Sequence, residues 1–367
     1  MNSIHPVLAA LRLRFAFVLL PVFLAAASQP ALAATPSTQF SLDGFLNAGT
    51  PASFNLADLE SFAASQPGGP TSVSVANSSG GTDVYTGVSL NSFLNAYIKT
   101  DPTVPKNDIL RDYVVATGTD GYKAVYSLGE LNTGFGNQND IIAYQLNGVD
   151  LTTSGFARIV APADVKAGRW VSNLASLDVG HVDYTAGQGG VSSQFTITGQ
   201  VSNPGTYDLS NLPPGSLTPS TVTVTSQPAS LAGTTFTGVS LWSLLNLAGI
   251  ITDPNVKNDI LGKYVIATGT DGYQAVFSLG ELNPNFGNQP DLLAYDNAPG
   301  VVLGSDGFAR IVVPNDGKGG RYVSNLVSLE VLGTTPVPLP PSALLMGSSL
   351  LALGFGRFRR RLPGSGK

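Results

Sequence analysis

Two pairs of arginines stand at matching places in the sequence and have the chemistry to hold an anion. Arg158 and Arg310 each follow Gly-Phe-Ala, and Arg169 and Arg321 each begin an Arg-aromatic-Val-Ser-Asn-Leu segment. A guanidinium group matches a phosphate or carboxylate with two hydrogen bonds. The alternative is a structural ion pair, because carboxylates outnumber basic groups in this chain. The pattern leaves both interpretations open.

Thiol chemistry is excluded by composition. The 367 residues include no cysteine and two histidines, His5 and His181. Disulfide scaffolds, thiolate metal sites, iron–sulfur clusters and cysteine nucleophiles are therefore ruled out. A zinc site built on several histidines is ruled out as well.

Repeated carboxylates invite a catalytic interpretation, but local structure explains them more simply. Asp120 and Asp271 stand in Thr-Asp-Gly-Tyr, where an Asp before Gly is typical of a hairpin turn. Glu130 and Glu281 end Ser-Leu-Gly-Glu, the pattern of a capping box. We expect turns and helix caps here rather than a base, an acid or a cation ligand.

Other repeated residues leave binding functions open. The oxygen-rich loops 132–140 and 283–291 could bind Ca²⁺, although they lack Asp-x-Asp-x-Asp spacing, so plain polar loops are expected. Four aromatic residues could line a sugar or pterin pocket, or pack in the core as aromatic side chains more commonly do: Tyr122, Trp170, Tyr273 and Tyr322.

The body of the chain is one sequence written twice. Residues 113–144 match residues 264–295 at 24 of 32 positions without a gap. The spacing of about 151 residues is far longer than that of solenoid repeats. We define residues 34–183 as the first repeat, 184–193 as a glycine-containing linker and 194–333 as the second repeat. His181 has no counterpart in the second repeat, so a Ser–His–Asp set in both is excluded.

Each repeat is predicted to be a β-rich α+β domain. Segments 195–199, 221–225, 264–268, 273–278, 292–295, 309–313 and 326–331 have strand character, and Gly269-Thr-Asp-Gly272 supplies a hairpin turn. A helix is expected from Ser240, with Leu241, Leu244, Leu245 and Ala248 on its buried face. Interspersed strands and short helices favour the α+β class.

Residues 1–33 have the pattern of a secretory signal peptide. Arg12 and Arg14 precede an apolar run over 15–27, and Ala31-Leu-Ala33 is a small-x-small cleavage site. The apolar run is too short for a comfortable membrane span. An uncleaved anchor is the alternative.

The segment 334–367 has a different design. Val337-Pro-Leu-Pro-Pro341 is followed by an apolar stretch at 342–356 and then by four arginines between 357 and 361. This is the pattern of a short membrane helix with a cytoplasmic arginine stop. The tail resembles the PEP-CTERM sorting signal of the VPLPA type. The resemblance implies recognition and cleavage by an exosortase, membrane contact through 342–361, and export in a Gram-negative-type bacterium to the cell surface or beyond. A simple tail anchor is the alternative.

Without these ends the chain is strongly acidic. The ends hold seven of the 19 basic residues and none of the 24 acidic ones, so residues 34–336 carry a net charge of −12. Phosphate contacts need clustered Lys and Arg. Nucleic acid is therefore excluded as a partner.

The order of motifs in each repeat resembles the molybdopterin-binding domain of the sulfite-oxidase-type oxidoreductases. The motifs are Gly-Val-Ser-Leu, Asp-Gly-Tyr with Ser-Leu-Gly-Glu-Leu, Ala-Arg-Ile-Val-x-Pro and Arg-x-Val-x-x-Leu, over roughly 38–180 and 193–332. The resemblance implies a sulfite-oxidase-like α+β fold in each copy, a cradle for molybdopterin and a cysteine on molybdenum. It carries Arg158, Arg169, Arg310 and Arg321 over as cofactor-binding positions.

The sequence departs from that family where the chemistry lies. The strand that should carry the cysteine reads Val73-Ser-Val-Ala-Asn-Ser78, and Val222-Thr-Val-Thr-Ser226 in the second repeat. Thr153 and Ser305 stand where the family has His, and Ser172 and Ser324 where it has Lys. A catalytic molybdenum centre is therefore not expected.

Three hypotheses remain. The first is an exported, surface-targeted and non-catalytic tandem protein that binds a surface polysaccharide or small anionic ligand, or builds extracellular matrix. The second is a molybdopterin oxidoreductase with a cysteine-free site. The third is a calcium- or glycan-binding module.

We predict that the mature protein begins near Ala34 and ends near Pro338, because the cleavage pattern and the sorting signal lie at those points. Intact mass spectrometry of the exported protein measures both ends. A mass that includes residues 1–33 and 339–367 would contradict the prediction.

Overall fold

The computed structural model describes residues 35–104, 106–212, 216–224, 229–298 and 300–334. The expected signal peptide and sorting tail lie outside these residues. Within the described part of the chain, no helix is long and apolar enough to cross a membrane.

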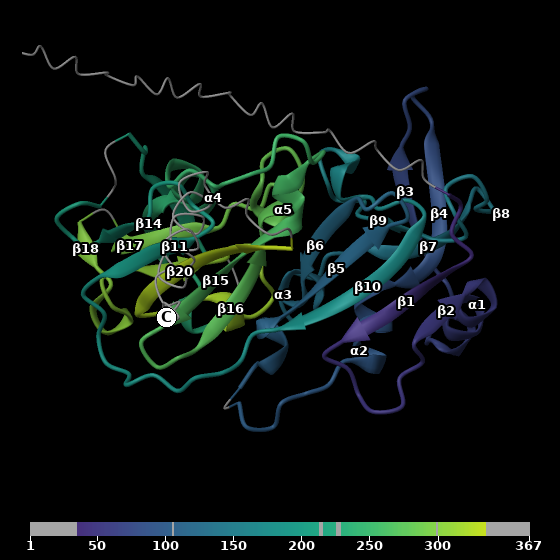
Figure 1. Ribbon diagram of the computed structural model, residues 1–367. Coiled ribbons are helices and arrows are strands. Elements are labelled where there is room, and N and C mark those ends of the chain that lie inside the picture. Colours follow the sequence, from purple (N-terminus) through teal and green to yellow (C-terminus); the bar gives the residue numbers. More distant parts are fainter. Residues whose placement is uncertain (1–34, 105, 213–215, 225–228, 299, 335–367) are drawn as a thin grey trace, which may run out of the picture. The chain divides into compact units, whose positions relative to one another are not determined.

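The first repeat is built from two sheets (Figure 1). One sheet has the strand order β2-β1-β10-β5-β6, and the other has the order β3-β4-β7-β8 with β9 also paired to β7. The strands are β1 (Gln39–Gly44), β2 (Ser53–Asn55), β3 (Thr71–Ala76), β4 (Thr82–Ser89), β5 (Asp112–Gly118), β6 (Lys123–Ser127), β7 (Ile141–Leu146), β8 (Val149–Asp150), β9 (Arg158–Val160) and β10 (Leu174–His181). The helices are α1 (Leu56–Ser65), α2 (Leu90–Tyr97) and α3 (Leu128–Leu131), with short 3₁₀ turns η1 (Asp108–Arg111) and η2 (Ala167–Arg169).

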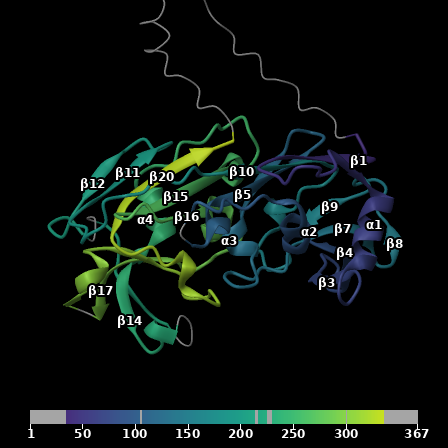
Figure 2. The same ribbon diagram turned by 90° about the horizontal axis from the view of Figure 1, so that it is seen from below.

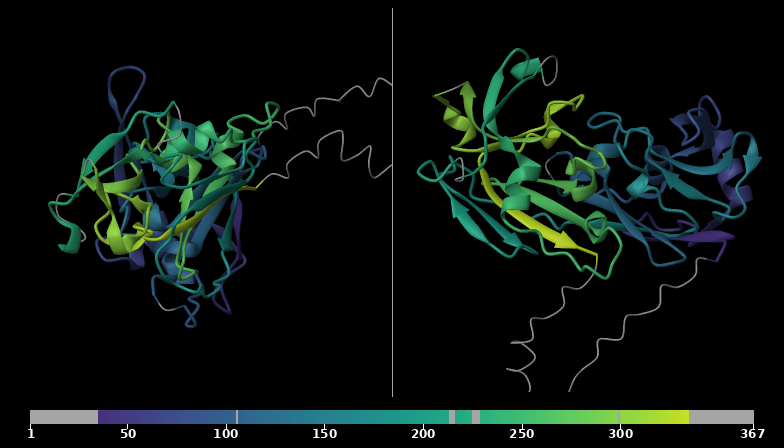
Figure 3. Two further views of the ribbon diagram at one scale, coloured as in Figure 1. Left: turned by 90° about the vertical axis from the view of Figure 1, so that its left-hand side faces the viewer. Right: turned by 90° about the horizontal axis from the view of Figure 1, so that it is seen from above.

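The second repeat has the same order of paired strands. Its sheets are β12-β11-β20-β15-β16 and β13-β14-β17-β18, with β19 paired to β17. Figure 2 shows β20 alongside β11 and β15, and β20 is the yellow arrow in the right panel of Figure 3. The strands are β11 (Phe195–Gly199), β12 (Gly205–Tyr207), β13 (Ser220–Thr223), β14 (Thr235–Ser240), β15 (Lys263–Gly269), β16 (Gln274–Ser278), β17 (Leu292–Ala298), β18 (Val301–Val302), β19 (Arg310–Val312) and β20 (Leu326–Gly333). The helices are α4 (Leu241–Leu247) and α5 (Leu279–Leu282), with 3₁₀ turns η3 (Ala229–Leu231), η4 (Asp259–Gly262), η5 (Gly304–Asp306) and η6 (Gly319–Arg321).

Local sequence explains where these elements begin and turn. Ser240 caps α4 through the backbone N–H of Ser243, and the predicted apolar face of that helix is buried. In the β5–β6 hairpin the Asp120 carboxylate accepts the N–H of Tyr122, and Asp271 repeats this contact in the second repeat. The predictions of a β-rich chain, of turn-forming aspartates and of this helix are confirmed.

Each repeat has its own apolar core, and two buried side chains of the other repeat pack into each core. Phe135 and Leu110 lie in the cluster formed by the second repeat. Phe286 and Leu261 lie in the cluster formed by the first repeat. Leu110 and Leu261 each end the segment Lys-Asn-Asp-Ile-Leu, and Phe135 and Phe286 each stand three residues after Ser-Leu-Gly-Glu-Leu-Asn. Each repeat therefore inserts equivalent side chains into the core of the other.

Two glycines make this packing possible. A methyl group on Gly168 would lie 2.1 Å from a ring carbon of Phe286, and one on Gly320 would lie 2.3 Å from a ring carbon of Phe135. Any larger residue would therefore push the inserted ring out of its seat. Close packing of this kind makes the site sensitive to volume changes.

We predict that Phe286→Ala lowers the free energy of unfolding by about 3–5 kcal/mol, because it removes a buried ring and leaves a cavity. Urea denaturation measures the change. The matched control is Leu209→Ala, since Leu209 is 60% exposed and its loss should change stability by no more than about 0.5 kcal/mol. Equal small effects of both variants would contradict the packing described here.

Candidate functional site

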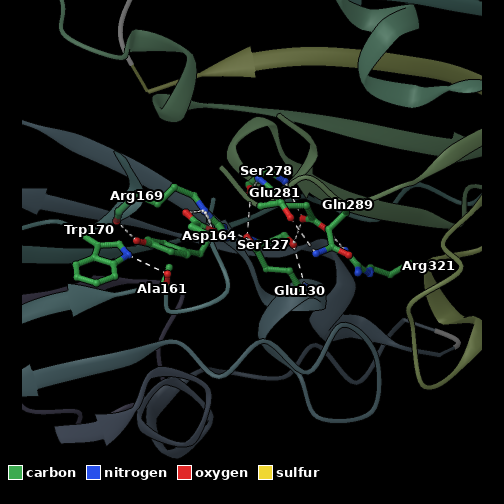
Figure 4. Close-up of polar contacts among 12 residues, drawn as sticks. Ser127, Glu130, Ala161, Asp164, Arg169, Trp170, Ser278, Glu281, Gln289 and Arg321 are labelled. Carbon is green, nitrogen blue, oxygen red and sulfur yellow. Dashed lines mark hydrogen bonds and ion pairs between the residues drawn. The ribbon is translucent and has the colours of Figure 1, made fainter. Parts of the chain in front are cut away.

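A buried polar network joins the two repeats at α3 and α5. Ser127 and Glu130 form a capping box, and Ser278 and Glu281 form the same box in the second repeat. The two boxes also bond to one another. The Ser127 hydroxyl donates to the Glu281 carboxylate at 2.9 Å, and the Ser278 hydroxyl donates to the Glu130 carboxylate at 3.0 Å (Figure 4). The predicted caps are confirmed, and each cap also holds the other repeat.

Two of the four candidate arginines belong to this network. Arg169 bonds to Glu130 at 2.6 Å and to Asp164 at 2.6 Å. Arg321 bonds to Asp316 at 2.5 Å and also to Glu281. Both side chains are almost completely buried, and Figure 4 shows them on either side of the serine–glutamate boxes. These guanidinium groups are occupied by carboxylates, which is the ion-pair alternative that the sequence left open.

The network contains more acidic than basic groups. Besides the four paired carboxylates, Asp140 and Asp291 are buried beside it, and neither of their carboxylates has a hydrogen-bond partner in the described part of the chain. Burial raises the pKa of Asp140 to about 7, against the lowering effect of Arg169. Burial also raises the pKa of Asp291 and that of Glu130, the latter to about 8. Protons therefore supply part of the charge balance near neutral pH.

Arg158 and Arg310 stand elsewhere, on the equivalent strands β9 of the first repeat and β19 of the second. The guanidinium of Arg158 lies over the rings of Tyr85 and Trp170, at 5.6 and 5.5 Å. The guanidinium of Arg310 lies over the Phe236 ring at 5.4 Å and pairs with Asp306. Burial lowers the pKa of both arginines.

Arg310 lines a cavity of about 610 Å³. Lys106 and Asn107 enter its wall from the first repeat, while the remaining wall belongs to the second repeat and the linker. The other lining residues used below are Asp271, Tyr273, Asp306, Tyr322 and Ser324. The site is therefore completed by both repeats.

Two polar atoms in the lining residues are buried and have no partner in the described part of the chain. They are Nε of Arg310 and the hydroxyl of Tyr322. Arg310 is 4% exposed and Tyr322 is 5% exposed. Leaving such a group without a hydrogen bond costs about 1–3 kcal/mol. Both atoms have almost no solvent-accessible surface, so a ligand with hydrogen-bonding oxygens would remove this cost only where the wall side chains move to admit it.

The matching cavity of the first repeat is smaller, at about 200 Å³. Lys257 and Asn258 enter it from the second repeat, as Lys106 and Asn107 enter the other. Trp170 occupies the position of Tyr322, and its indole N–H donates to the Ala161 carbonyl at 2.8 Å. The bulky ring has its hydrogen bond within its own repeat, so this wall lacks the free hydroxyl that Tyr322 supplies.

Sequence reasoning found part of this site. It singled out Arg310, Tyr273 and Tyr322, but it did not bring Lys106 and Asn107 to the same place. A signal was present, because Lys-Asn-Asp-Ile-Leu occurs at 106–110 and again at 257–261. As for the loops 132–140 and 283–291, the His, Asp and Glu side chains of the described residues form no group of three that could hold a metal ion.

Comparison with known proteins gives a distant likeness among solved structures alone. No family model matches the chain, and no curated protein matches it. Among solved structures, the chain is similar to the sulfane dehydrogenase SoxCD from Paracoccus pantotrophus, with 23% identity and a TM-score of 0.28. The match covers 38% of this chain, and the chain spans 38% of the length of that one.

The residues present do not fit the molybdenum cofactor that the sequence resemblance implies. The chain has no cysteine to supply a thiolate, and strands β3 and β13 carry Thr, Ser, Val and Ala. Of the four arginines carried over from the family, Arg169 and Arg321 hold buried carboxylates. We therefore derive no chemistry through molybdenum.

We predict that the protein becomes less stable as pH rises from about 4 to about 8. Asp140 titrates near 3.8 when exposed and near 7 in the fold, so the folded state binds more protons over this interval and loses stability as they leave. Urea denaturation at pH 5 and pH 8 should differ on the order of 3 kcal/mol from this group. Asp140→Asn should reduce the difference, whereas Asp43→Asn, at an exposed position, should not. An unchanged pH dependence in Asp140→Asn would contradict the assignment.

Proposed function

We propose that this chain is an exported, non-catalytic binding protein whose second repeat holds a small polar ligand with one negative charge. The observation that carries the proposal is the cavity at Arg310, whose lining residues include two buried polar atoms without a partner in the part of the chain that the structure describes. An open polar wall of this kind suits a hydroxyl-bearing ligand better than an apolar one.

Charge balance narrows the ligand class. Arg310 and Lys106 are positive, and Asp271 and Asp306 also line the cavity. Asp306 takes one nitrogen of the Arg310 guanidinium and leaves Nε free. A polyphosphate in this cavity would be repelled by the carboxylates of Asp271 and Asp306. A ligand with a single carboxylate needs only the Nε edge of the Arg310 guanidinium. The strongly acidic body also disfavours highly charged anions.

A sugar acid, free or at the end of a surface polysaccharide, meets these requirements. Its carboxylate would accept from Nε of Arg310, and its hydroxyls would bond to Tyr322 and Ser324. The Tyr273 ring would pack against the sugar, as aromatic rings with a polar end do at wet sites. The calcium module and the molybdopterin enzyme receive no such support from the described residues.

The proposal also accounts for the two repeats of the chain and for its two ends. Two tandem copies of a sulfite-oxidase-like domain, in which cofactor chemistry has been lost, account for the repeated strand order and the missing thiolate. A signal peptide at 1–33 and a PEP-CTERM-type tail at 334–367 would direct the protein through the inner membrane to an exosortase. The mature protein would then act at the cell surface or beyond.

We predict that galacturonate binds to the mature protein and that galactose, which lacks the carboxylate, binds at least tenfold more weakly. A hydrogen bond to a charged group contributes about 1.5–3 kcal/mol, and about 1.4 kcal/mol is tenfold in affinity. Isothermal titration calorimetry measures both sugars, and glucuronate and glucose serve as a second pair.

Matched variants locate the site. Arg310→Gln should lower galacturonate affinity at least tenfold, while Arg158→Gln, the same change at the matching position of the first repeat, should leave it unchanged. Equal binding of acid and neutral sugars, or equal loss in both variants, would overturn the proposal. Stoichiometric molybdenum in protein from a molybdate-fed host would favour the oxidoreductase hypothesis instead.

A further inference from the structure

Many contacts between the two repeats occur twice, at equivalent positions of the repeats; the bond from the Lys166 ammonium to the Asn285 side chain, at 2.6 Å, is one that does not, because Gly134 stands at the position that matches Asn285. Asn107 donates its amide hydrogen to the Tyr273 hydroxyl at 2.8 Å, and Asn258 donates to the Tyr122 hydroxyl at 2.8 Å. The serine–glutamate bonds described above also form an equivalent pair, from the first repeat to the second and from the second to the first. In each of these pairs, both repeats donate and accept the same kind of hydrogen bond.

The packing contacts are reciprocal as well. The Phe286 carbonyl accepts from the N–H of Val165 at 2.9 Å, and the Phe135 carbonyl accepts from the N–H of Gly317 at 2.8 Å. The aliphatic stems of the network arginines also cross over. A methyl group on Gly280 would lie 2.5 Å from Cδ of Arg169, and one on Gly129 would lie 2.6 Å from Cδ of Arg321.

Two equivalent tyrosines meet where the repeats join. Tyr113 and Tyr264 hold the same position in their repeats, their ring centroids are 4.2 Å apart, and their hydroxyls are 2.9 Å apart. Only a residue at a local two-fold axis can contact its own counterpart. The inter-repeat face, defined as the surface that makes these reciprocal contacts, is therefore isologous.

The second repeat of another copy offers the first repeat the same contacts as its neighbour in the chain, and the isologous arrangement also lets a repeat face its like. We propose that the inter-repeat face is a self-recognition surface through which repeats of two copies of this chain exchange partners. In an exchanged pair both faces are filled by the same contacts, so only the path of the linker and the entropy of association change.

The linker between the repeats determines the protein concentration at which repeats of two chains pair with one another. Val182 is bonded to the Arg111 carbonyl on the first repeat, and Gly187 and Gly189 are bonded to carbonyls of Asp271 and Thr270 on the second. A short linker, held to the second repeat in this way, gives the internal partner an effective concentration of at least the order of millimolar. Exchanged pairs should thus be minor in dilute solution and become substantial at millimolar concentration, as on a crowded surface.

The test breaks the internal pairing in two complementary ways. Gly168→Leu blocks the seat of Phe286 in one full-length chain, and Gly320→Leu blocks the seat of Phe135 in another. Mixing them leaves an intact second repeat on the first chain and an intact first repeat on the other. We expect light scattering to show dimers. They form either in the mixture, between the intact second repeat of one chain and the intact first repeat of the other, or in each variant alone, between two copies of its intact repeat. Val149→Leu, at a position 69% exposed, is the matched control and should stay monomeric.

A second arm needs no variant. Isotope-light and isotope-heavy wild-type chains are unfolded together, refolded at millimolar and at micromolar concentration, and examined by native mass spectrometry. Mixed dimers after refolding at the higher concentration support the proposal. Its failure is separate from that of the sugar proposal, because neither readout involves a ligand. Monomers alone in the wild-type arm, with folded monomers in the variant arm, would overturn it.

Discussion

Arg169 and Arg321 lie out of reach of water, and a guanidinium in that position must be neutralised where it stands. The carboxyl groups of Glu130 and Glu281 pair with these guanidinium groups together with Asp164 and Asp316, and the two glutamates also close the capping boxes of α3 and α5. Because the serines of each box also bond to the glutamate of the other, helix start, ion pair and repeat pairing depend on one set of atoms. Removing one partner of such a set leaves a buried charge or an empty hydrogen bond, which costs more than the contact itself contributes.

This network determines where the candidate binding site stands. With α3 and α5 fixed against one another, Leu110 and Leu261 enter the opposite cores, and the Lys-Asn pair before each leucine reaches the opposite cavity. The repeats are alike up to this point and then differ. The indole N–H of Trp170 has a hydrogen bond beside the smaller cavity, whereas the Tyr322 hydroxyl at the larger one has no partner among the described residues. The two repeats thus share one frame, and the change from Trp170 to Tyr322 is the difference on which the proposed binding site rests.

Sequence patterns were sufficient for features set by neighbours in the chain. The alternation of 195–199, the Ser240 cap and the Asp120 turn depend on residues a few positions apart, and each was predicted. The four arginines looked alike in the sequence because their shared motifs do not show what lies across the fold. Arg169 meets Glu130, which is 39 residues away, while Arg310 meets a cavity completed by Lys106. Contacts between the repeats could not be predicted, although the repetition of Lys-Asn-Asp-Ile-Leu was a visible hint.

The proposed binding function rests on Nε of Arg310, which has no partner in the described part of the chain, as is also true of Nε of Arg158, but which belongs to a residue that lines the larger cavity. Nitrogen-15 NMR of the arginine Nε–H groups, recorded while galacturonate is added, tests it most directly. We expect the Arg310 resonance, assigned through its loss in Arg310→Gln, to shift and saturate with the sugar acid while that of Arg158 does not move. An unmoved Arg310 resonance, or equal shifts of Arg158 and Arg310, would contradict it.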